Sequence, residues 1–404
     1  MIQSTLVYKK EIRKDNLILF LFNSSVLSTV AIQFFITSSL YSTLRPVLYL
    51  LVLATLLLVF TKKSNTEKNS IIFFYTVTIY LSLISALLIC FYKSEVVVPG
   101  SLIEFTLPFL ILYIGFKVNL TKDQMSKLIL RYMILVTFLG LYIVFYFGDG
   151  FHVTQQYFFN QKNTIGPFLG SVVIISLISL LAKNRMVLVS NKILIILFLV
   201  NISSLFALRN RAGIVAVGIC LIIYALSKTV FKTKFKITTI LLVPFVFLIL
   251  AALFITGALN PVIDIVNSSL FLNFDLKDLN NLSANRTDTY LSVLEFLKVS
   301  PLFGEVLVES NISTTPHNYL LNLWLHYGVV GMLPISIFYF SLWVLVLFKL
   351  LIRKRTDLGF YLLLFALVVS IFEPDFPFSP LTTVTLTWFL FGYSIKKRED
   401  TVAD

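Results

Sequence analysis

The segment TTPHNYLLNLWLHYGVVGMLP, residues 314–334, decides the fold, because it joins a polar His-Asn pair to two apolar stretches. His317 and Asn318 precede the first stretch, and Gly328 and Gly331 separate it from the second. Asn is favoured at helix starts, and Gly is favoured where helices end. The pattern therefore predicts a helix that starts beside a titratable imidazole, ends at the glycines and runs into a further hydrophobic span.

The composition of the whole chain indicates its class. Hydrophobic residues make up 58% of the 404 residues and charged residues only 13%. Apolar runs of about 17 to 25 residues recur along the sequence, which is the length that a helix needs to cross a bilayer. We expect an all-α polytopic membrane protein that forms a single integral membrane domain over 1–404. About twelve spans are predicted, near 17–37, 44–61, 70–92, 99–116, 128–147, 164–182, 190–208, 212–228, 237–259, 329–350, 358–372 and 378–395.

The basic residues fall mainly on one side of these predicted spans. Of the 33 Lys and Arg, 25 lie in the loops and tails on the side of both termini. Since loops rich in Lys and Arg stay in the cytoplasm, both termini are expected to be cytoplasmic. Residues 260–317 then form one large loop on the outer face, between the ninth and tenth spans. The same distribution accounts for the net charge of +13 without nucleic acid as a partner.

The sequence gives little support for a metal or another cofactor. Cys90 and Cys220 fall within predicted spans and have no CxxC partner, and the chain has only three His. Paired-histidine zinc motifs, P-loops and dinucleotide fingerprints are not present in the sequence. We therefore expect no metal and no cofactor.

Two arginines depart from the charge pattern on the outer face. Arg209 and Arg211 lie in LFALRNRAGIVAVG, residues 205–218, a short hairpin between the seventh and eighth predicted spans. A charge at membrane depth costs about 2.5 kcal/mol or more. Either both side chains extend to the lipid headgroups, or they form an anion site, because the planar guanidinium fork suits phosphate.

The end of the large outer loop has helical periodicity. In NRTDTYLSVLEFLKVSPLFGEV, residues 285–306, the apolar positions over 290–297 predict a short amphipathic helix on or near the membrane, ended by Pro301 and Gly304. Arg286 stands just before this helix. Its partner is either an acid such as Asp288 or a bound ligand.

Four motifs follow one another over residues 158–334. FFNQKNTIGPFLG at 158–170 comes first, then RNRAG at 209–213, the segment at 285–306, and PHNYLLNLWLHYGVVG at 316–331. In this order they resemble the elements of the O-antigen ligase and polymerase superfamily. The chain departs from the pattern in having Asn210 where Ser is common and no Gly directly after Arg211.

This resemblance implies a GT-C-like glycosyltransferase architecture in the bacterial inner membrane, with a periplasmic active face. The implied donor is an undecaprenyl diphosphate-linked oligosaccharide, used without metal. Membrane lipid and a polysaccharide chain-length regulator are the other implied partners. Arg211 and Arg286 would bind the diphosphate, and His317 would accept the proton of the acceptor hydroxyl. Further substrate-binding residues are expected to be Arg209, Asn318, Lys162 and Asn163.

Several alternatives stay open at this point. A polymerase is favoured over a ligase because the motif at 158–170 and the Pro-His-Asn element are more typical of polymerases, and a lipid-linked glycan transporter or flippase is the third possibility. Asn318 either orients the imidazole or the sugar, or caps a helix. His326 follows His317 by nine residues, which places it on the opposite face of a helix and indicates a structural role. If His317 is not the base, the next choices are Glu373, Asp375 and Glu104.

Overall fold

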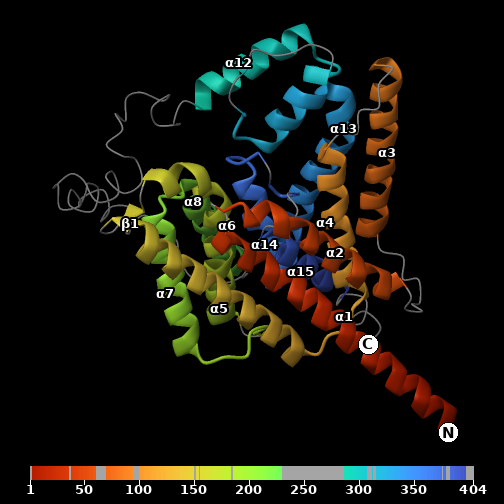
Figure 1. The fold of residues 1–404 in the computed structure, drawn as a ribbon, viewed down its shortest axis with the longest axis vertical. Coiled ribbons are helices and arrows are strands. Elements are labelled where there is room, and N and C mark those ends of the chain that lie inside the picture. The colour runs from red at the N-terminus through yellow and green to blue at the C-terminus, as the bar shows by residue number, and fades with distance from the viewer. Residues whose placement is uncertain are drawn as a thin grey trace.

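The computed structural model describes residues 2–35, 38–60, 70–93, 100–149, 152–153, 155–182, 185–229, 286–306, 312, 315–374, 376–378 and 383–396. These residues are almost entirely helical, as the sequence predicts (Figure 1). The departure is a small antiparallel pair of two-residue strands, β1 (Gly148–Asp149) and β2 (His152–Val153), between two helices. The ninth predicted span, 237–259, and most of the loop 260–317 lie outside the described residues.

Helices occupy the other predicted spans. They are α1 (Ile2–Ala31) with a 3-10 turn at Ile32–Phe35, α2 (Leu40–Phe60), α3 (Ser70–Lys93), α4 (Gly100–Lys117), α5 (Lys122–Phe147), α6 (Gln155–Leu181), α7 (Asn191–Ala207), α8 (Arg211–Thr229), α13 (Tyr319–Leu347), α14 (Leu358–Val369) and α15 (Val384–Lys396). The amphipathic helix predicted in the outer loop is α12 (Arg286–Val299). Arg286 is its first residue, so the helix starts slightly earlier than the sequence pattern indicated.

Within the described residues, six helical segments are long and apolar enough to cross a membrane. These segments are Asn16–Phe35, Leu40–Phe60, Lys122–Phe147, Lys162–Leu181, Arg211–Lys228 and Tyr319–Ile352. Four further apolar helices are shorter, at Ser70–Ser85, Phe105–Lys117, Asn191–Ala207 and Leu358–Val369. The chain is therefore a helical membrane protein with several candidate spans.

The interior of the bundle is built around two short apolar helices. Every residue of α14 is buried, and α15 packs between it and α4 (Figure 1). The approach of α15 to α4 depends on Gly392, where an added Cβ would overlap the backbone of Leu112. Small residues allow helix backbones in membranes to approach closely, which strengthens packing where the hydrophobic effect between helices is weak.

A break in α13 joins this helix to the end of α12. Gly328 has φ 60° and ψ −167°, as expected from the glycine pattern. The break leaves backbone N–H groups of the following turn without intrahelical partners. Val329 N donates to the carbonyl of Pro301 at 2.9 Å, and Val330 N donates to that of Leu302 at 3.0 Å. The Pro-Leu-x-Gly segment therefore caps the second half of α13 and fixes α12 over the first half.

Gly328→Ala is expected to destabilise the fold by about 2 kcal/mol or more, because alanine is strained at this φ and its Cβ would overlap the backbone of Leu302 and Phe303. The measurement is thermal unfolding of the purified protein in detergent. The matched control is Gly218→Ala, since an added Cβ at Gly218 in α8 meets nothing within 4 Å. The control should match or exceed wild-type stability. Equal melting temperatures for both variants would contradict this account of the break.

Candidate functional site

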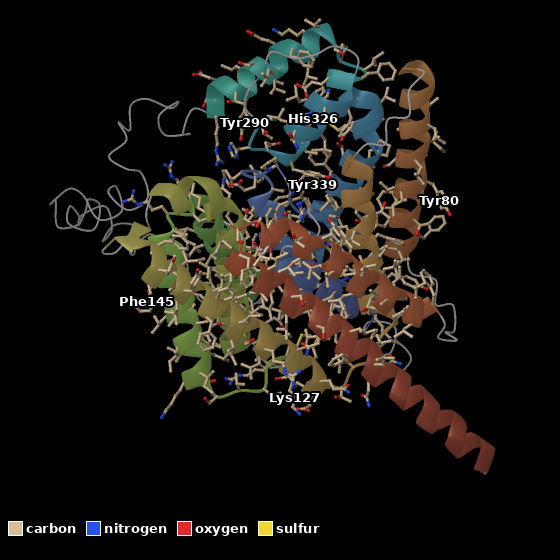
Figure 2. The ribbon with its side chains drawn as sticks, viewed as in Figure 1. Tyr80, Lys127, Phe145, Tyr290, His326 and Tyr339 are labelled. Atoms are coloured by element: carbon tan, nitrogen blue, oxygen red, sulfur yellow. The ribbon has the colours of Figure 1, made fainter. Side chains whose placement is uncertain are left out.

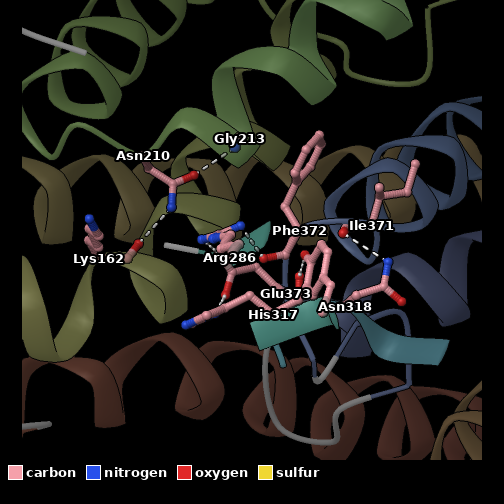
Figure 3. A network of polar contacts seen from close by, with 10 residues as sticks. Lys162, Asn210, Gly213, Arg286, His317, Asn318, Ile371, Phe372 and Glu373 are labelled. Atoms are coloured by element: carbon pink, nitrogen blue, oxygen red, sulfur yellow. Dashed lines mark hydrogen bonds and ion pairs between the residues drawn. The ribbon is translucent and has the colours of Figure 1, made fainter. Parts of the chain in front are cut away.

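Charged residues from four parts of the chain meet at one end of the bundle (Figure 3). Arg211 is the first residue of α8, Arg286 is the first residue of α12, and Lys162 lies on α6. Lys162 interacts electrostatically with Arg211, Arg286, Glu373 and Arg209, and Arg211 interacts with Arg286. We call Lys162, Arg209, Arg211, Arg286, His317 and Glu373 the ion cluster. Tyr290 and His326 mark the same end of the molecule, opposite Lys127 (Figure 2).

Glu373 is the carboxylate of the ion cluster. Its side chain is 5% exposed, and one oxygen, Oε1, lies 3.6 Å from Nη2 of Arg286. The other oxygen, Oε2, lies 3.5 Å from Nδ1 of His317. Arg286 also donates from Nη1 to the carbonyl of Phe372 at 2.8 Å. The acidic partner of Arg286 in the structure is thus Glu373, whereas the sequence suggested Asp288.

The imidazole of His317 faces this carboxylate at ion-pair distance, without a hydrogen bond between the two side chains. Nδ1 faces Glu373, so Nε2 is the ring nitrogen that remains for a substrate, and 42% of the side chain is exposed. A carboxylate at Nδ1 favours the tautomer in which Nε2 accepts a proton. The arrangement can therefore remove a proton from a hydroxyl group that enters the exposed side.

Tyr290 holds the backbone next to this imidazole. Its hydroxyl donates to the carbonyl of His317 at 2.8 Å, which connects the first turn of α12 to the residue before the α13 cap. Burial raises the pKa of the Tyr290 phenol above its ordinary value, and the neighbouring Arg286 opposes this shift. The phenol stays protonated and available as a donor at neutral pH.

Asn318 fastens the start of α13 to the chain that follows α14. Its Oδ1 accepts from the backbone N–H of Leu321 at 3.0 Å, and its Nδ2 donates to the carbonyl of Ile371 at 3.1 Å. Tyr319 N donates to the carbonyl of Ser370 at 3.0 Å. Both ends of the Asn318 amide are engaged, which favours the helix-cap interpretation. These bonds place Glu373 beside His317.

The turn between α7 and α8 carries Arg209 and Arg211 and fixes their positions. Asn210 is only 1% exposed, its Oδ1 accepts from Gly213 N at 2.7 Å, and its Nδ2 donates to the carbonyl of Lys162 at 3.0 Å. It caps α8 and ties this helix to α6. Ser and Asn are both favourable N-caps, so Asn210 can do what a Ser does at this position.

Arg209 occupies the strained position of the same turn. Its φ is 50°, in the left-handed region that non-glycine residues rarely adopt, and such strain concentrates at functional sites. Burial lowers the pKa of the Arg209 guanidinium from its ordinary value. An arginine nevertheless stays charged at neutral pH, so it adds to the positive potential of the ion cluster.

The remaining predicted residues lie outside the ion cluster or outside the described part of the chain. Asn163 follows Lys162 on α6 and is half-buried. His326 pairs through Nδ1 with Oε2 of Glu305 at 2.5 Å, which agrees with the structural role expected for it. Asp375 and the side chain of Glu104 lie outside what the structure describes.

The described residues contain no group of three or more His, Cys, Asp or Glu side chains arranged to hold a metal ion. The chain matches no protein-family model, and no curated protein is significantly similar to it. Chemically, the cluster combines four cationic side chains with one carboxylate, which pairs with Arg286 and lies 3.5 Å from the imidazole of His317. This arrangement can bind a group with more than one negative charge and accept a proton beside it.

Proposed function

We propose that the protein is a metal-independent membrane glycosyltransferase that polymerises O-antigen or a related surface polysaccharide. It transfers a glycan from undecaprenyl diphosphate to a hydroxyl of another lipid-linked repeat unit. The observation that carries the proposal is the ion cluster, in which the His317 and Glu373 pair lies beside Lys162, Arg209, Arg211 and Arg286.

The cationic side chains account for the binding of the donor diphosphate. Arg211 and Arg286 begin two helices, so the positive ends of both helix dipoles add to their charges. When the bond between the sugar and the diphosphate breaks, negative charge develops on the leaving oxygen. Preorganised guanidinium groups in a partly buried site stabilise this charge most in the transition state.

The imidazole accounts for activation of the acceptor. The acceptor hydroxyl attacks the anomeric carbon, a new carbon–oxygen bond forms, and undecaprenyl diphosphate departs with the bonding electrons. Nε2 of His317 takes the hydroxyl proton, and Glu373 stabilises the resulting imidazolium. Glu373 contacts both His317, which takes the proton, and Arg286, which binds the donor diphosphate. It therefore connects proton removal to donor binding.

A polymerase is favoured over a ligase by the resemblance of residues 158–170 to the polymerase motif that contains Lys162. Lys162 is near enough to the same arginines for their charges to repel one another, which supports a role for this motif in binding an anionic donor. The experiment is to delete the coding sequence and separate the lipopolysaccharide of the strain by size. Loss of the ladder with one repeat unit kept on the core supports a polymerase. Loss of every repeat from the core would instead identify a ligase or an earlier step.

Arg211→Lys is expected to lower the rate of chain extension about tenfold or more, although the charge is kept. Lysine cannot present two parallel donors to phosphate as the guanidinium does. The rate is measured on purified protein at matched amounts. Arg45→Lys is the control, because Arg45 lies over the ring of Tyr41 on α2 rather than in the ion cluster. Equal rates for wild type and Arg211→Lys would point to simple anchoring at the lipid headgroups.

A further inference from the structure

A second charged site lies at the end of the bundle opposite the ion cluster, where Figure 2 labels Lys127. A pocket of about 550 Å³ opens there, and three separate parts of the chain supply its lining together with Tyr393 of α15. They are the start of α5, the connection from α6 to α7, and the connection from α13 to α14. Each part supplies at least one cationic side chain, and the four are Lys122, Arg185, Lys354 and Arg355. Asp357 is the acid among the residues that line the pocket.

The charges in this pocket do not cancel. Asp357 pairs with Arg355, whose Nη1 lies 3.3 Å from Oδ2, and both side chains are about one quarter exposed. Arg185 is positioned by a hydrogen bond from Nη1 to Oδ1 of Asn191, which is a neutral partner. Among the residues that line the pocket, four are thus cationic and one is acidic. The pocket has a surplus of positive charge held on fixed elements, which suits an anion.

The backbone that carries two of the cations is strained. α13 ends in a π-helical turn, Phe348–Ile352, and Lys354 has φ 48° in the left-handed region. Arg355 N donates to the carbonyl of Lys349 at 3.1 Å, which closes this turn. Strained backbone of this kind persists where the surrounding structure enforces it, and it is concentrated at binding sites. Here it turns the chain so that Lys354 and Arg355 line the same pocket.

The rest of the lining shows where this anion site lies in the membrane. Met125, Ile178, Met186 and Leu358 contribute apolar surface beside the cations. α5 begins at Lys122, α6 ends at Leu181 and α14 begins at Leu358, so the pocket lies where helices leave the apolar layer. A ligand that fits has a phosphate next to an apolar body, as a phospholipid does at a membrane surface.

We propose that this pocket binds the phosphate headgroup of an anionic phospholipid, separately from the donor site at the other end. Basic pockets between membrane helices are suited to such headgroups, and each nearby Lys or Arg contributes about 1 kcal/mol. The bound lipid would contact all three connections at once. The proposal does not depend on the glycosyltransferase function, since the two sites share no residue.

The test uses the full-length protein, purified in detergent and stripped of lipid, in calorimetric titrations with three soluble probes. These are dihexanoyl phosphatidylglycerol, dihexanoyl phosphatidylcholine and inorganic phosphate. We expect saturable binding of the phosphatidylglycerol, with weaker binding of the other two. The double variant Arg185→Gln with Lys354→Gln should bind it about tenfold to thirtyfold more weakly. Lys127→Gln is the control, because Lys127 lies at the same end, pairs with Asp123 and does not line the pocket.

Three results would overturn the proposal. They are equal binding of phosphatidylglycerol and phosphatidylcholine, inorganic phosphate binding as tightly as the lipid, or Lys127→Gln weakening binding as much as the double variant. The second of these would indicate a free-anion site. If the double variant does not fold, the charge-conserving pair Arg185→Lys with Lys354→Arg replaces it and must retain binding. Affinity of the wild type must also fall as salt is raised.

Discussion

His317→Ala is expected to lower the rate of chain extension by a factor of about 10² to 10⁴, which is the usual cost of removing a positioned general base. Donor lipid should still bind, because the diphosphate is assigned to Arg211 and Arg286. The measurements are the length distribution of the product at equal protein levels and the retention of donor lipid by the purified variant. If the rate falls while donor binding is unchanged, His317 acts as the proton acceptor and other groups hold the diphosphate.

His326→Ala is the matched control for this variant. His326 lies on α13, whose cap directly follows His317, is similarly exposed and also has a glutamate partner, but that partner is Glu305, outside the ion cluster. The control should keep its rate within a few-fold of wild type. If both histidine variants extended chains equally well, His317 would be structural and the base would have to be sought elsewhere.

Glu373→Gln is expected to slow extension about 10²-fold or more, although the side chain keeps its size. A neutral amide neither fixes the tautomer of His317 nor stabilises the imidazolium as a carboxylate does. It also leaves Arg286 without its counter-charge in a site where Glu373 is almost fully buried. Glu373→Asp should recover part of the rate, since the carboxylate is kept on a shorter side chain.

Glu305→Gln provides the comparison for this second prediction. It removes the carboxylate from a second glutamate and histidine pair, Glu305 and His326. Its rate should stay close to that of wild type. A normal rate for Glu373→Gln, or an equal loss for Glu305→Gln, would show that a buried carboxylate at Glu373 is not required beside the imidazole.

The sequence predicted well the features that depend on residue types or spacings within one short segment. The break at Gly328 follows from a residue type that tolerates positive φ, and α12 follows from the apolar spacing over 290–297. Arg211 and Arg286 stood out because charges are rare at the membrane face. In the structure Glu373 lies between Arg286 and His317, and Arg211 interacts electrostatically with Arg286.

The partners of these residues could not be predicted in the same way. Glu373 was predicted only as an alternative base to His317, because nothing in its local sequence marks it as a partner of the imidazole. Its position depends on the bonds from Asn318 and Tyr319 to Ile371 and Ser370, which form only when α13 packs beside the end of α14. The Pro301 segment ends α12 as predicted, but the sequence did not indicate that its carbonyls also cap the second half of α13. Both are contacts between distant segments.

The central claim is that this chain alone extends lipid-linked glycans by direct transfer from undecaprenyl diphosphate. The most direct measurement incubates the purified full-length protein with undecaprenyl diphosphate-linked repeat units, with a chelator present and no nucleotide added, and resolves the products by length. We expect lipid-linked chains longer by whole repeats, together with free undecaprenyl diphosphate. Unchanged substrate, or extension that strictly requires a divalent ion, would contradict the account.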